Sequence, residues 1–255
     1  MFEFPLEPSI LQILPFAVFC LFGLCWIIQM IYYWALYSRL AFYKAKKKET
    51  AQPPVSVIIC AKNEYQNLLH NLPLVLEQDY PDYEVIVVND ASDDDSIELL
   101  NSFTRKYRHL RIFDLERNLN FFSGKKFPLS LGIKSAKNEI VLLTDADCKP
   151  SGPNWISHMV SNYGEKTAIV LGYGTYRKTV GFLNQLIRYD AFLVAMQYLS
   201  FALAGKPYMG VARNLSYKKS LFFEAKGFTS HYKLKSGDDD LFINRAANKS
   251  NTRIE

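Results

Sequence analysis

The segment Ile140–Pro150, IVLLTDADCKP, ends an apolar run with two aspartates that are separated by one small residue. The run from Ile140 to Leu143 is typical of a buried strand. Asp145 and Asp147 then either lie on a plain surface turn or face one ligand together, as the carboxylates of a metal site do. An Asp-x-Asp triplet arises by chance often enough that the rest of the chain has to decide between the two.

The preceding segments alternate between strand and helix patterns. β-Branched apolar runs are each followed by a polar turn and a stretch with helical spacing. Such alternation predicts an α/β fold with parallel strands and helices on both faces of the sheet. The expected strands are Val55–Ile59, Glu84–Val88, Leu110–Leu115 and the run that ends at Asp145, and the expected helices are Asn67–Leu76, Ser96–Tyr107 and one starting near Pro128.

Polar side chains stand at the carboxyl ends of three of these strands. They are residues 62–64, residues 89–90, and the pair Asp145 and Asp147. Because ligands of parallel sheets bind beyond the carboxyl ends of the strands, we expect these groups to share one pocket. The GxxxxGK[ST] and GxGxxG patterns are both absent, which argues against P-loop and dinucleotide chemistry. Two carboxylates in a turn suit Mg²⁺ or Mn²⁺, which prefer oxygen ligands.

The composition excludes a general nucleic-acid binder. The 255 residues are 49% hydrophobic and 22% charged, with a formal net charge of +5. Five positive charges lie in one short stretch, at Arg39, Lys44, Lys46, Lys47 and Lys48, so the remainder of the chain is close to neutral. A nucleic-acid-binding domain would spread lysine and arginine over its folded surface. The four cysteines form no CxxC pair or zinc spacing, so we expect reduced, structural thiols.

The N-terminal segment predicts a membrane anchor. Ile10–Leu36 contains no charged residue and is longer than the roughly 20 residues that cross a bilayer. Aromatic residues crowd its C-terminal end and the basic stretch follows, so the positive-inside rule places the rest of the chain in the cytoplasm, at the inner membrane. The alternative is a buried or interfacial hairpin broken at Pro15. The expected organisation is an anchor over residues 1–37, a basic and proline-containing linker over 38–53, and a catalytic domain over 54–255.

Beyond these patterns, the chain resembles a family 2 glycosyltransferase of the GT-A fold, of the membrane-anchored bacterial type. The resemblance rests on six segments in the family's order and spacing, which is far more specific than any one of them. The segments are VSVIICAKNE, EVIVVNDASDDDS, SGKKFPLSLGI, VLLTDADC, MGVARNLSYKKSLFFEAKGF and SGDDDLFINR, between Val55 and Arg245.

The resemblance implies a nucleotide-sugar site. Asn63, Glu64 and Asp90 match positions that hold the base and ribose, where carboxylates accept hydrogen bonds from imide N–H groups and hydroxyls. Lys125 matches the lysine that approaches the diphosphate, whereas Lys126 is expected to be less involved and exposed to solvent. A turn or helix cap is the alternative for Asp90.

The same comparison assigns Asp145 and Asp147 to the metal and nucleotide-sugar motif. Asp147 is the expected direct metal ligand, and Asp145 serves either the ribose or a metal-bound water. Asn214 matches a region that contacts donor sugar or acceptor, where Gly210 permits close approach of the backbone. Residues 93–95 are expected to cap the following helix.

The acidic segment Ser236–Leu241, SGDDDL, matches the motif that supplies the general base. Counting back from the leucine assigns the base to Asp238, with Asp239 as the second candidate. Three adjacent carboxylates raise one another's pKa, which suits a base. The alternative is the acidic first turn of a helix.

The implied reaction is inverting transfer of a hexose from a nucleotide-diphospho-sugar, with a UDP-sugar favoured, to a glycan or a lipid-linked acceptor. The family's QxxRW motif and C-terminal membrane helices are not found, so we expect either a truncated product or a short variant. Two alternatives stay open: a metal-dependent nucleotidyltransferase of related fold, and a non-catalytic fragment that binds sugar nucleotides.

The segment Val180–Leu203 is long and apolar but carries Arg188 and Asp190 near its centre. Two charges at the centre of a bilayer are costly. We therefore expect a helix that either lies on the membrane surface or packs into the catalytic domain.

Overall fold

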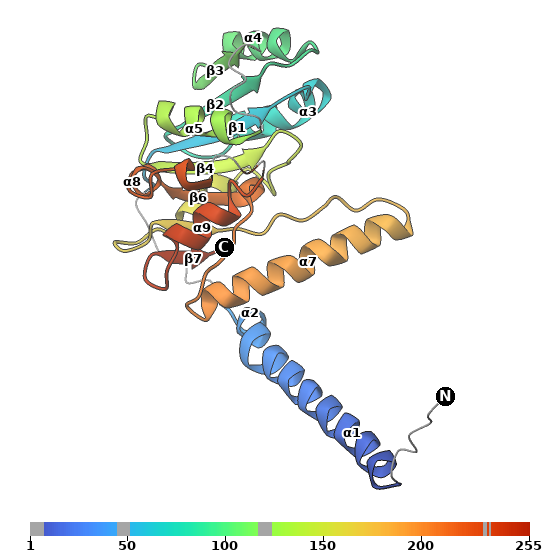
Figure 1. Cartoon of the computed structure of the whole chain (residues 1–255). Helices are drawn as coiled ribbons and strands as arrows, with labels where there is room; N and C mark the ends of the chain where they lie inside the picture. Colours follow the sequence, from blue (N-terminus) through green and yellow to red (C-terminus); the bar gives the residue numbers. More distant parts are fainter. Residues whose placement is uncertain (1–7, 45–51, 117–123, 232–233, 235) are drawn as a thin grey trace. The chain divides into compact units, whose positions relative to one another are not determined.

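A computed structural model describes residues 8–44, 52–116, 124–231, 234 and 236–255 (Figure 1). The chain divides into two compact units, Met1–Tyr43 and Lys44–Glu255, which are described here one at a time. Residues 45–51 of the expected linker lie outside the described residues.

The N-terminal unit is one helical run. It consists of α1 (Pro8–Ile31), a π-helical turn (Tyr32–Tyr37) and α2 (Ser38–Ala41). Pro15 lies inside α1 and does not end it, so the hairpin break considered from the sequence is not found. The stretch Ile13–Ala41 contains an 18-residue window with a mean hydropathy of 2.2 and is long and apolar enough to cross a membrane. The helical run continues to Ala41, beyond residue 37 where the anchor was expected to end.

The second unit is built on a mixed sheet of seven strands in the order β3-β2-β1-β4-β6-β5-β7 (Figure 1). The four strands predicted from the sequence form its parallel half. In the other half, β6 runs antiparallel to β4 and β5, and β7 is parallel to β5. The strands are β1 (Val55–Ala61), β2 (Tyr83–Asp90), β3 (Leu110–Leu115), β4 (Ile140–Asp145), β5 (Ile169–Leu171), β6 (Leu215–Lys218) and β7 (Thr252–Ile254).

Helices cover both faces of the sheet, as the alternating pattern predicts. Alternate residues of β1 and β2 pack with α3 (Tyr65–Leu76) and α6 (Trp155–Val160) in one apolar core. On the other face, α5 (Lys126–Ser135) approaches the sheet closely at Gly132. A Cβ atom there would lie 2.6 Å from Cγ2 of Ile58, so glycine sets the spacing between helix and strand.

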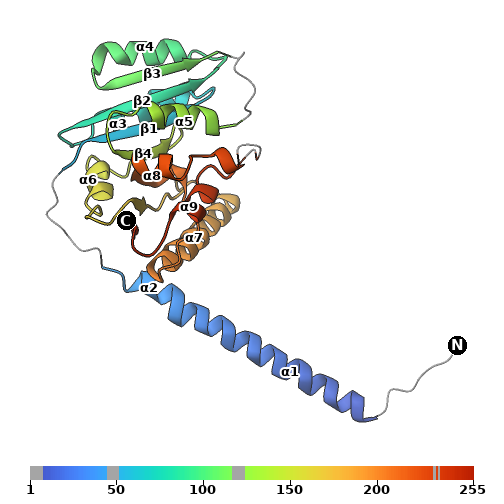
Figure 2. The ribbon, with the colours of Figure 1, turned by 60° about the vertical axis from the view of Figure 1, so that its left-hand side comes forward.

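The remaining helices lie toward the edges of the sheet. From the two viewpoints, α4 (Ser96–Lys106) lies beside β3 at one edge, and α9 (Asp240–Ala246) lies toward the other (Figures 1 and 2). Short helical segments connect the later strands. They are η3 (Ala212–Asn214), α8 (Lys219–Glu224) and η4 (Thr229–His231).

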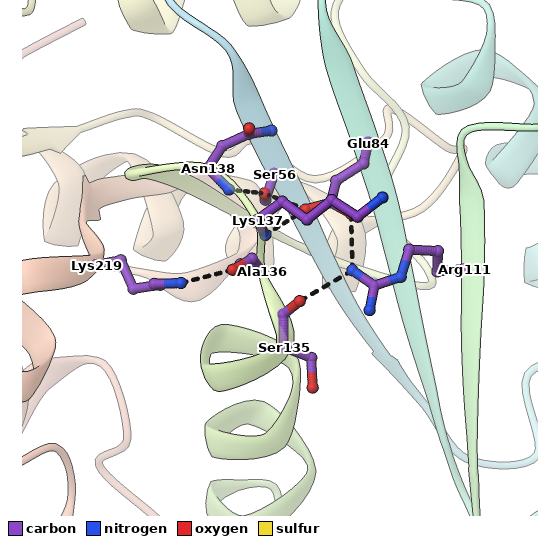
Figure 3. Close-up of polar contacts among 8 residues, drawn as sticks. All are labelled: Ser56, Glu84, Arg111, Ser135, Ala136, Lys137, Asn138 and Lys219. Atoms are coloured by element: carbon purple, nitrogen blue, oxygen red, sulfur yellow. Dashed lines mark hydrogen bonds and ion pairs between the residues drawn. The ribbon is translucent and has the colours of Figure 1, made fainter.

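The amino ends of the parallel strands are joined through the carboxylate of Glu84, which is 6% exposed (Figure 3). Its Oε1 accepts hydrogen bonds from Oγ of Ser56 (2.7 Å) and from the backbone amide of Lys137 (2.6 Å). Its Oε2 accepts one from Nη1 of Arg111 (2.9 Å), which also donates to the carbonyl of Ser135. Burial alone would raise the pKa of Glu84, but these hydrogen bonds outweigh it and lower the pKa.

The expected helix within Val180–Leu203 is α7 (Phe182–Leu203), and its two halves differ. The second half packs into the domain, with Ala195, Tyr198 and Leu199 buried. The first half leaves Phe182 and Leu183 74% and 70% exposed. The second half therefore matches the alternative of a helix packed into the catalytic domain, and contact of the first half with a membrane surface stays a prediction.

Candidate active site

A cavity of about 430 Å³ opens at the carboxyl ends of β1, β2 and β4. The parallel register brings these strand ends together, with Cys60 of β1 opposite Asp145 of β4. The predicted convergence of polar groups is thus found. The residues that line the cavity are Cys60, Ala61, Lys62, Glu64, Asp90, Gly124, Lys125, Pro128, Asp145, Ala146 and Asp147.

The Asp-x-Asp segment forms a tight turn at the end of β4. The amide of Cys148 donates to the carbonyl of Asp145 (3.0 Å), and Nδ2 of Asn71 donates to the carbonyl of the buried Ala146 (3.1 Å). Asp145 and Asp147 both line the cavity, together with Ala146 between them. The turn is therefore a feature of the pocket, not of a plain surface loop.

A carboxylate oxygen of Asp145, one of Asp147 and Sγ of Cys148 all lie within 4.8 Å of one another. Burial raises the pKa of the Cys148 thiol to about 12, and both aspartates add to the increase, so the thiol stays protonated near neutral pH. It donates to Oδ1 of Asp147 (3.4 Å). Two carboxylates with a protonated thiol fit a hard cation such as Mg²⁺ or Mn²⁺ better than a thiolate-bound metal.

Lys125 supplies positive charge at the same point. Its Nζ donates to Oδ1 of Asp145, and both side chains are about one-third exposed. Burial alone would lower the pKa of Lys125, but the Asp145 carboxylate outweighs it and raises the pKa. The ammonium group therefore stays charged and can meet an anionic ligand in the cavity.

Two of the other predicted nucleotide-binding residues, Asp90 and Glu64, also line the cavity. Asp90 forms an ion pair with Lys62 (3.8 Å), whose side chain is 58% exposed and can move toward solvent. Glu64 accepts from Nδ2 of Asn67 (2.6 Å), the first-turn neighbour in α3. Both carboxylates retain oxygen atoms that can accept hydrogen bonds from a ligand.

Asn63 joins two loops. It has a positive φ of 55°, and its Oδ1 accepts from the amide of Asp93 (2.7 Å) while its own amide donates to Oγ of Ser92 (2.9 Å). Asn tolerates this left-handed conformation better than most residues. Asn63 is not among the residues that line the cavity, and its side chain holds the ends of β1 and β2 together.

Helix capping was expected from residues 93–95, and Asp94 provides it. Its two carboxylate oxygens accept from the first amide of α3, at Tyr65 (3.0 Å), and from the first amide of α4, at Ser96 (3.2 Å). Asp95 occupies the N-cap position of α4 without a side-chain cap bond.

Asn214 lies beyond the cavity, at the start of β6. Its Oδ1 accepts from Nε1 of Trp155 (2.9 Å), and its Nδ2 donates to the carbonyl of Tyr173 (3.0 Å). The backbone at Gly172 passes so close that a Cβ atom there would lie 2.3 Å from Nδ2 of Asn214. The amide of Asn214 thus holds the segment after β5 against α6.

The acidic motif separates into residues with different contacts. Asp239 is the N-cap of α9: one oxygen accepts from the amide of Asp240 (2.9 Å) and the other from the amide of Ala212 (2.8 Å). Asp238 lines a second cavity of about 530 Å³, together with Ser236, Gly237 and the following residues. Asp239 borders the same cavity, but its two carboxylate oxygens are held by backbone amides.

Electrostatics connect Asp238 with the first cavity. Burial raises the pKa of Asp238 above its usual range, Asp239 adds to the increase, and Lys125 opposes it. Asp145 also contributes, so Asp238 lies within electrostatic reach of the Lys125–Asp145 pair although the two hollows have different linings. A carboxylate whose pKa is raised in this way is suited to accept a proton.

Two residues of the site were not recognised from the sequence. Lys126 was expected to be exposed, which is wrong: it is 3% exposed, and its Nζ donates to the carbonyls of Leu234 and Ser236. Burial raises the pKa of Asp240 to about 6, with further contributions from Asp239 and Asp238. The environment of Lys126 has no local sequence signal, because its partners are distant in the sequence, whereas the adjacent carboxylates of Asp238 and Asp239 are visible in the sequence beside Asp240.

The sequence model of a family described as glycosyl transferase family 2 matches residues 56–224, more than half of the chain. The chain belongs to glycosyl transferase family 2. The matched region includes every residue that lines the first cavity, and the acidic segment that lines the second cavity lies downstream of it.

Among curated proteins, the poly-beta-1,6-N-acetyl-D-glucosamine synthase of Staphylococcus epidermidis is 32% identical over 126 residues, which cover 48% of this chain and 29% of that protein. An uncharacterized glycosyltransferase of Haemophilus influenzae is 27% identical over 146 residues, covering 57% of this chain and 42% of that protein. The matches therefore span less than half the length of these family 2 relatives.

Among solved structures, a mannosyltransferase of Pyrobaculum calidifontis in complex with GDP-Man and Mn²⁺ superimposes with a TM-score of 0.67 at 20% identity, covering 89% of this chain and 64% of that one. S. aureus TarS 1–349 in complex with UDP-GlcNAc gives 0.55 at 19% identity, covering 79% and 56%. These similarities confirm the predicted GT-A fold of this family 2 chain.

Proposed function

We propose that this family 2 protein is a glycosyltransferase that moves a sugar from a nucleotide-diphospho-sugar to a hydroxyl group of a glycan or lipid-linked acceptor. The observation that carries the proposal is the grouping of Lys125, Asp145 and Asp147 in one cavity, within electrostatic reach of Asp238. The first three suit an anionic, metal-bound donor, and the fourth suits a general base.

The residues that line the cavity indicate how the donor would be bound. Asp90 and Glu64 offer acceptors for the hydroxyls and imide of a nucleoside, and Lys125 lies where a diphosphate would gain from its charge. In our proposal, Asn63 and Asn214 hold the surrounding loops in place, because their side chains form hydrogen bonds with other groups of the protein. A UDP-sugar remains the favoured donor, although the two structural neighbours contain GDP-Man and UDP-GlcNAc.

Asp147, the more exposed of the two aspartates, is the proposed direct ligand of Mg²⁺ or Mn²⁺, with Asp145 beside it. A divalent cation bound there would neutralise charge on the departing nucleoside diphosphate. The neighbour from Pyrobaculum calidifontis holds Mn²⁺ in its complex.

On the acceptor side, Asp238 takes the proton of the attacking hydroxyl. The acceptor oxygen then forms a bond to the anomeric carbon from the face opposite the diphosphate, and the bond between that carbon and the phosphate oxygen breaks. The configuration at the anomeric carbon is inverted. Lys125 stabilises the negative charge of the leaving diphosphate throughout.

A donor screen tests the proposal. The full chain is incubated with UDP-Glc, UDP-GlcNAc and GDP-Man, each with Mn²⁺ or Mg²⁺, and the released nucleotide is identified. We expect a nucleoside diphosphate from at least one donor. Release of pyrophosphate would instead indicate nucleotidyl transfer, and tight binding without turnover would indicate a non-catalytic binding protein.

The proposed organisation keeps a membrane anchor at residues 1–37, a linker at 38–53 and the catalytic domain at 54–255, with the active site on the cytoplasmic side. The apolar helical stretch Ile13–Ala41 supports the anchor. The first half of α7 supports a second contact with lipid, because Phe182, Leu183 and Tyr189 are 60–74% exposed beside the exposed basic residues 177 and 178.

The membrane contact of α7 can be measured in proteoliposomes that contain the full chain. A fluorophore is attached to cysteine at position 183, or at position 102 on α4 as control, after the native cysteines have been replaced. We expect brominated lipids to quench the label in Leu183→Cys and not in Ser102→Cys. Equal quenching at both positions would contradict the proposed contact.

A further inference from the structure

Lys126 is the first residue of α5 and is almost completely buried. Its Nζ donates hydrogen bonds to the carbonyl oxygens of Leu234 (2.6 Å) and Ser236 (2.8 Å). These two carbonyls belong to the segment that leads to Asp238, more than a hundred residues further along the chain. One side chain therefore ties the start of α5 to the segment that carries the proposed base.

A buried ammonium group needs compensating partners, because its transfer out of water is costly. The two carbonyl dipoles supply charge-assisted hydrogen bonds, which are stronger than neutral ones. They also fix the backbone on both sides of residue 235. Gly237 follows with a positive φ of 81°, so the chain turns sharply between the second carbonyl and Asp238.

The segment is held on its other side as well. Asp239 caps α9 and accepts from the amide of Ala212, directly after Asp238. Asp238 thus sits between two fixed points, the Lys126 contacts before it and the Asp239 contacts after it. This arrangement restricts where the Asp238 carboxylate can lie.

The neighbouring lysine contacts the other half of the site. Lys125 donates to Asp145 in the donor cavity, whereas Lys126 donates to the carbonyls before Asp238. Because the two lysines are consecutive, the start of α5 contacts both the proposed diphosphate-binding part of the site and the segment that carries the proposed base.

We infer that Lys126 is a positioning residue that holds Asp238 at the distance from the donor that proton transfer requires. The inference rests on the proposed function of Asp238 as general base. Misplacement of a reacting group by about 1 Å can cost about 10²-fold in rate, so loss of these contacts should act mainly on turnover.

The test compares Lys126→Met with Lys125→Met in the full chain. Methionine removes the ammonium group and keeps a long apolar side chain. For Lys126→Met we expect kcat for nucleoside diphosphate release to fall about 10²-fold, with unchanged dissociation constants for UDP and GDP in the presence of Mn²⁺. Lys125→Met should weaken nucleotide binding. An unchanged kcat in Lys126→Met, or equal losses of nucleotide affinity in both variants, overturns the inference.

Amide hydrogen exchange gives a readout that does not depend on turnover. In Lys126→Met we expect faster exchange across residues 236–241 and unchanged exchange in β4. Lys126→Arg, which keeps a charged donor, serves as a second variant if methionine prevents folding, with a smaller loss of kcat expected. If the unmodified chain releases no nucleotide from any donor, the proposed function fails and the positioning role fails with it. Normal turnover and unchanged exchange in Lys126→Met overturn the positioning role alone.

Discussion

Replacing Asp238 and Asp239 by alanine, one at a time, separates the proposed base from the helix cap beside it. Asp239→Ala removes the N-cap bond to the amide of Asp240 and the bond to the amide of Ala212. Losing a cap costs about 1 kcal/mol, and leaving the amide of the buried Ala212 without its acceptor costs about 1–3 kcal/mol. The expected loss is therefore about 3 kcal/mol, or roughly 6–12 °C in melting temperature for a unit of this size.

Asp238→Ala should behave differently. Since burial and Asp239 raise the pKa of Asp238, its charge is less favourable in the folded chain than in the unfolded chain above that pKa. Removing the charge therefore leaves the melting temperature at pH 7 unchanged or raises it, and this gain disappears as the pH falls below the ordinary carboxyl range. Turnover should fall by about 10²–10⁴-fold, the usual contribution of a general base.

The assay combines thermal melting, followed by near-ultraviolet circular dichroism, with nucleotide release at saturating donor. Asp238→Asn, which keeps the shape of the side chain, should match Asp238→Ala in turnover and should still bind nucleotide. In the unmodified protein, kcat/KM should decline on the acid side at a higher pH than an ordinary aspartate would give, because the raised pKa protonates the base earlier. Normal turnover in Asp238→Ala, or an unchanged melting temperature in Asp239→Ala, would refute these roles.

Three further predictions concern the metal, the buried network and helix packing. Chelation with EDTA should abolish turnover, and Asp147→Ala should raise the Mn²⁺ concentration needed for half-maximal rate, whereas full activity in EDTA would contradict the assigned ligands. Glu84→Gln should destabilise the domain by about 2–3 kcal/mol in urea unfolding, because glutamine has one acceptor oxygen and its NH₂ group would face either Arg111 or the donors of Ser56 and Lys137. Gly132→Ala should cost about 1–3 kcal/mol through its clash at α5, while Gly152→Ala, with open space around it, should be neutral in the same melting experiment.

The parallel half of the sheet could be predicted because its signals are local. Val55–Ala61, Tyr83–Asp90, Leu110–Leu115 and Ile140–Asp145 are apolar, β-branched runs, and each expected strand overlaps an observed one. The order in which polar residues follow these strands then places the donor-side groups at one edge.

The antiparallel half could not be predicted in the same way. Ile169–Leu171 and Leu215–Lys218 are three and four residues long, and nothing in their own composition specifies that the second inserts between the first and β4. Such pairing is decided by tertiary contacts. The burial of Lys126 could not be predicted for the same reason, since its hydrogen-bond partners lie in a loop that is distant in the sequence.

The acidic motif shows why residue type alone left two candidates for the base. Asp238 and Asp239 have the same chemistry, and the count from Leu241 favours the first only by alignment with the family pattern. The contacts add an independent argument: both carboxylate oxygens of Asp239 are held by backbone amides, of Asp240 at the start of α9 and of Ala212. A base has to direct a lone pair at the reacting proton, so these contacts favour Asp238 as the proposed base. Burial, and then the charge of the neighbouring Asp239, raises the pKa of Asp238, which suits a group that has to accept a proton.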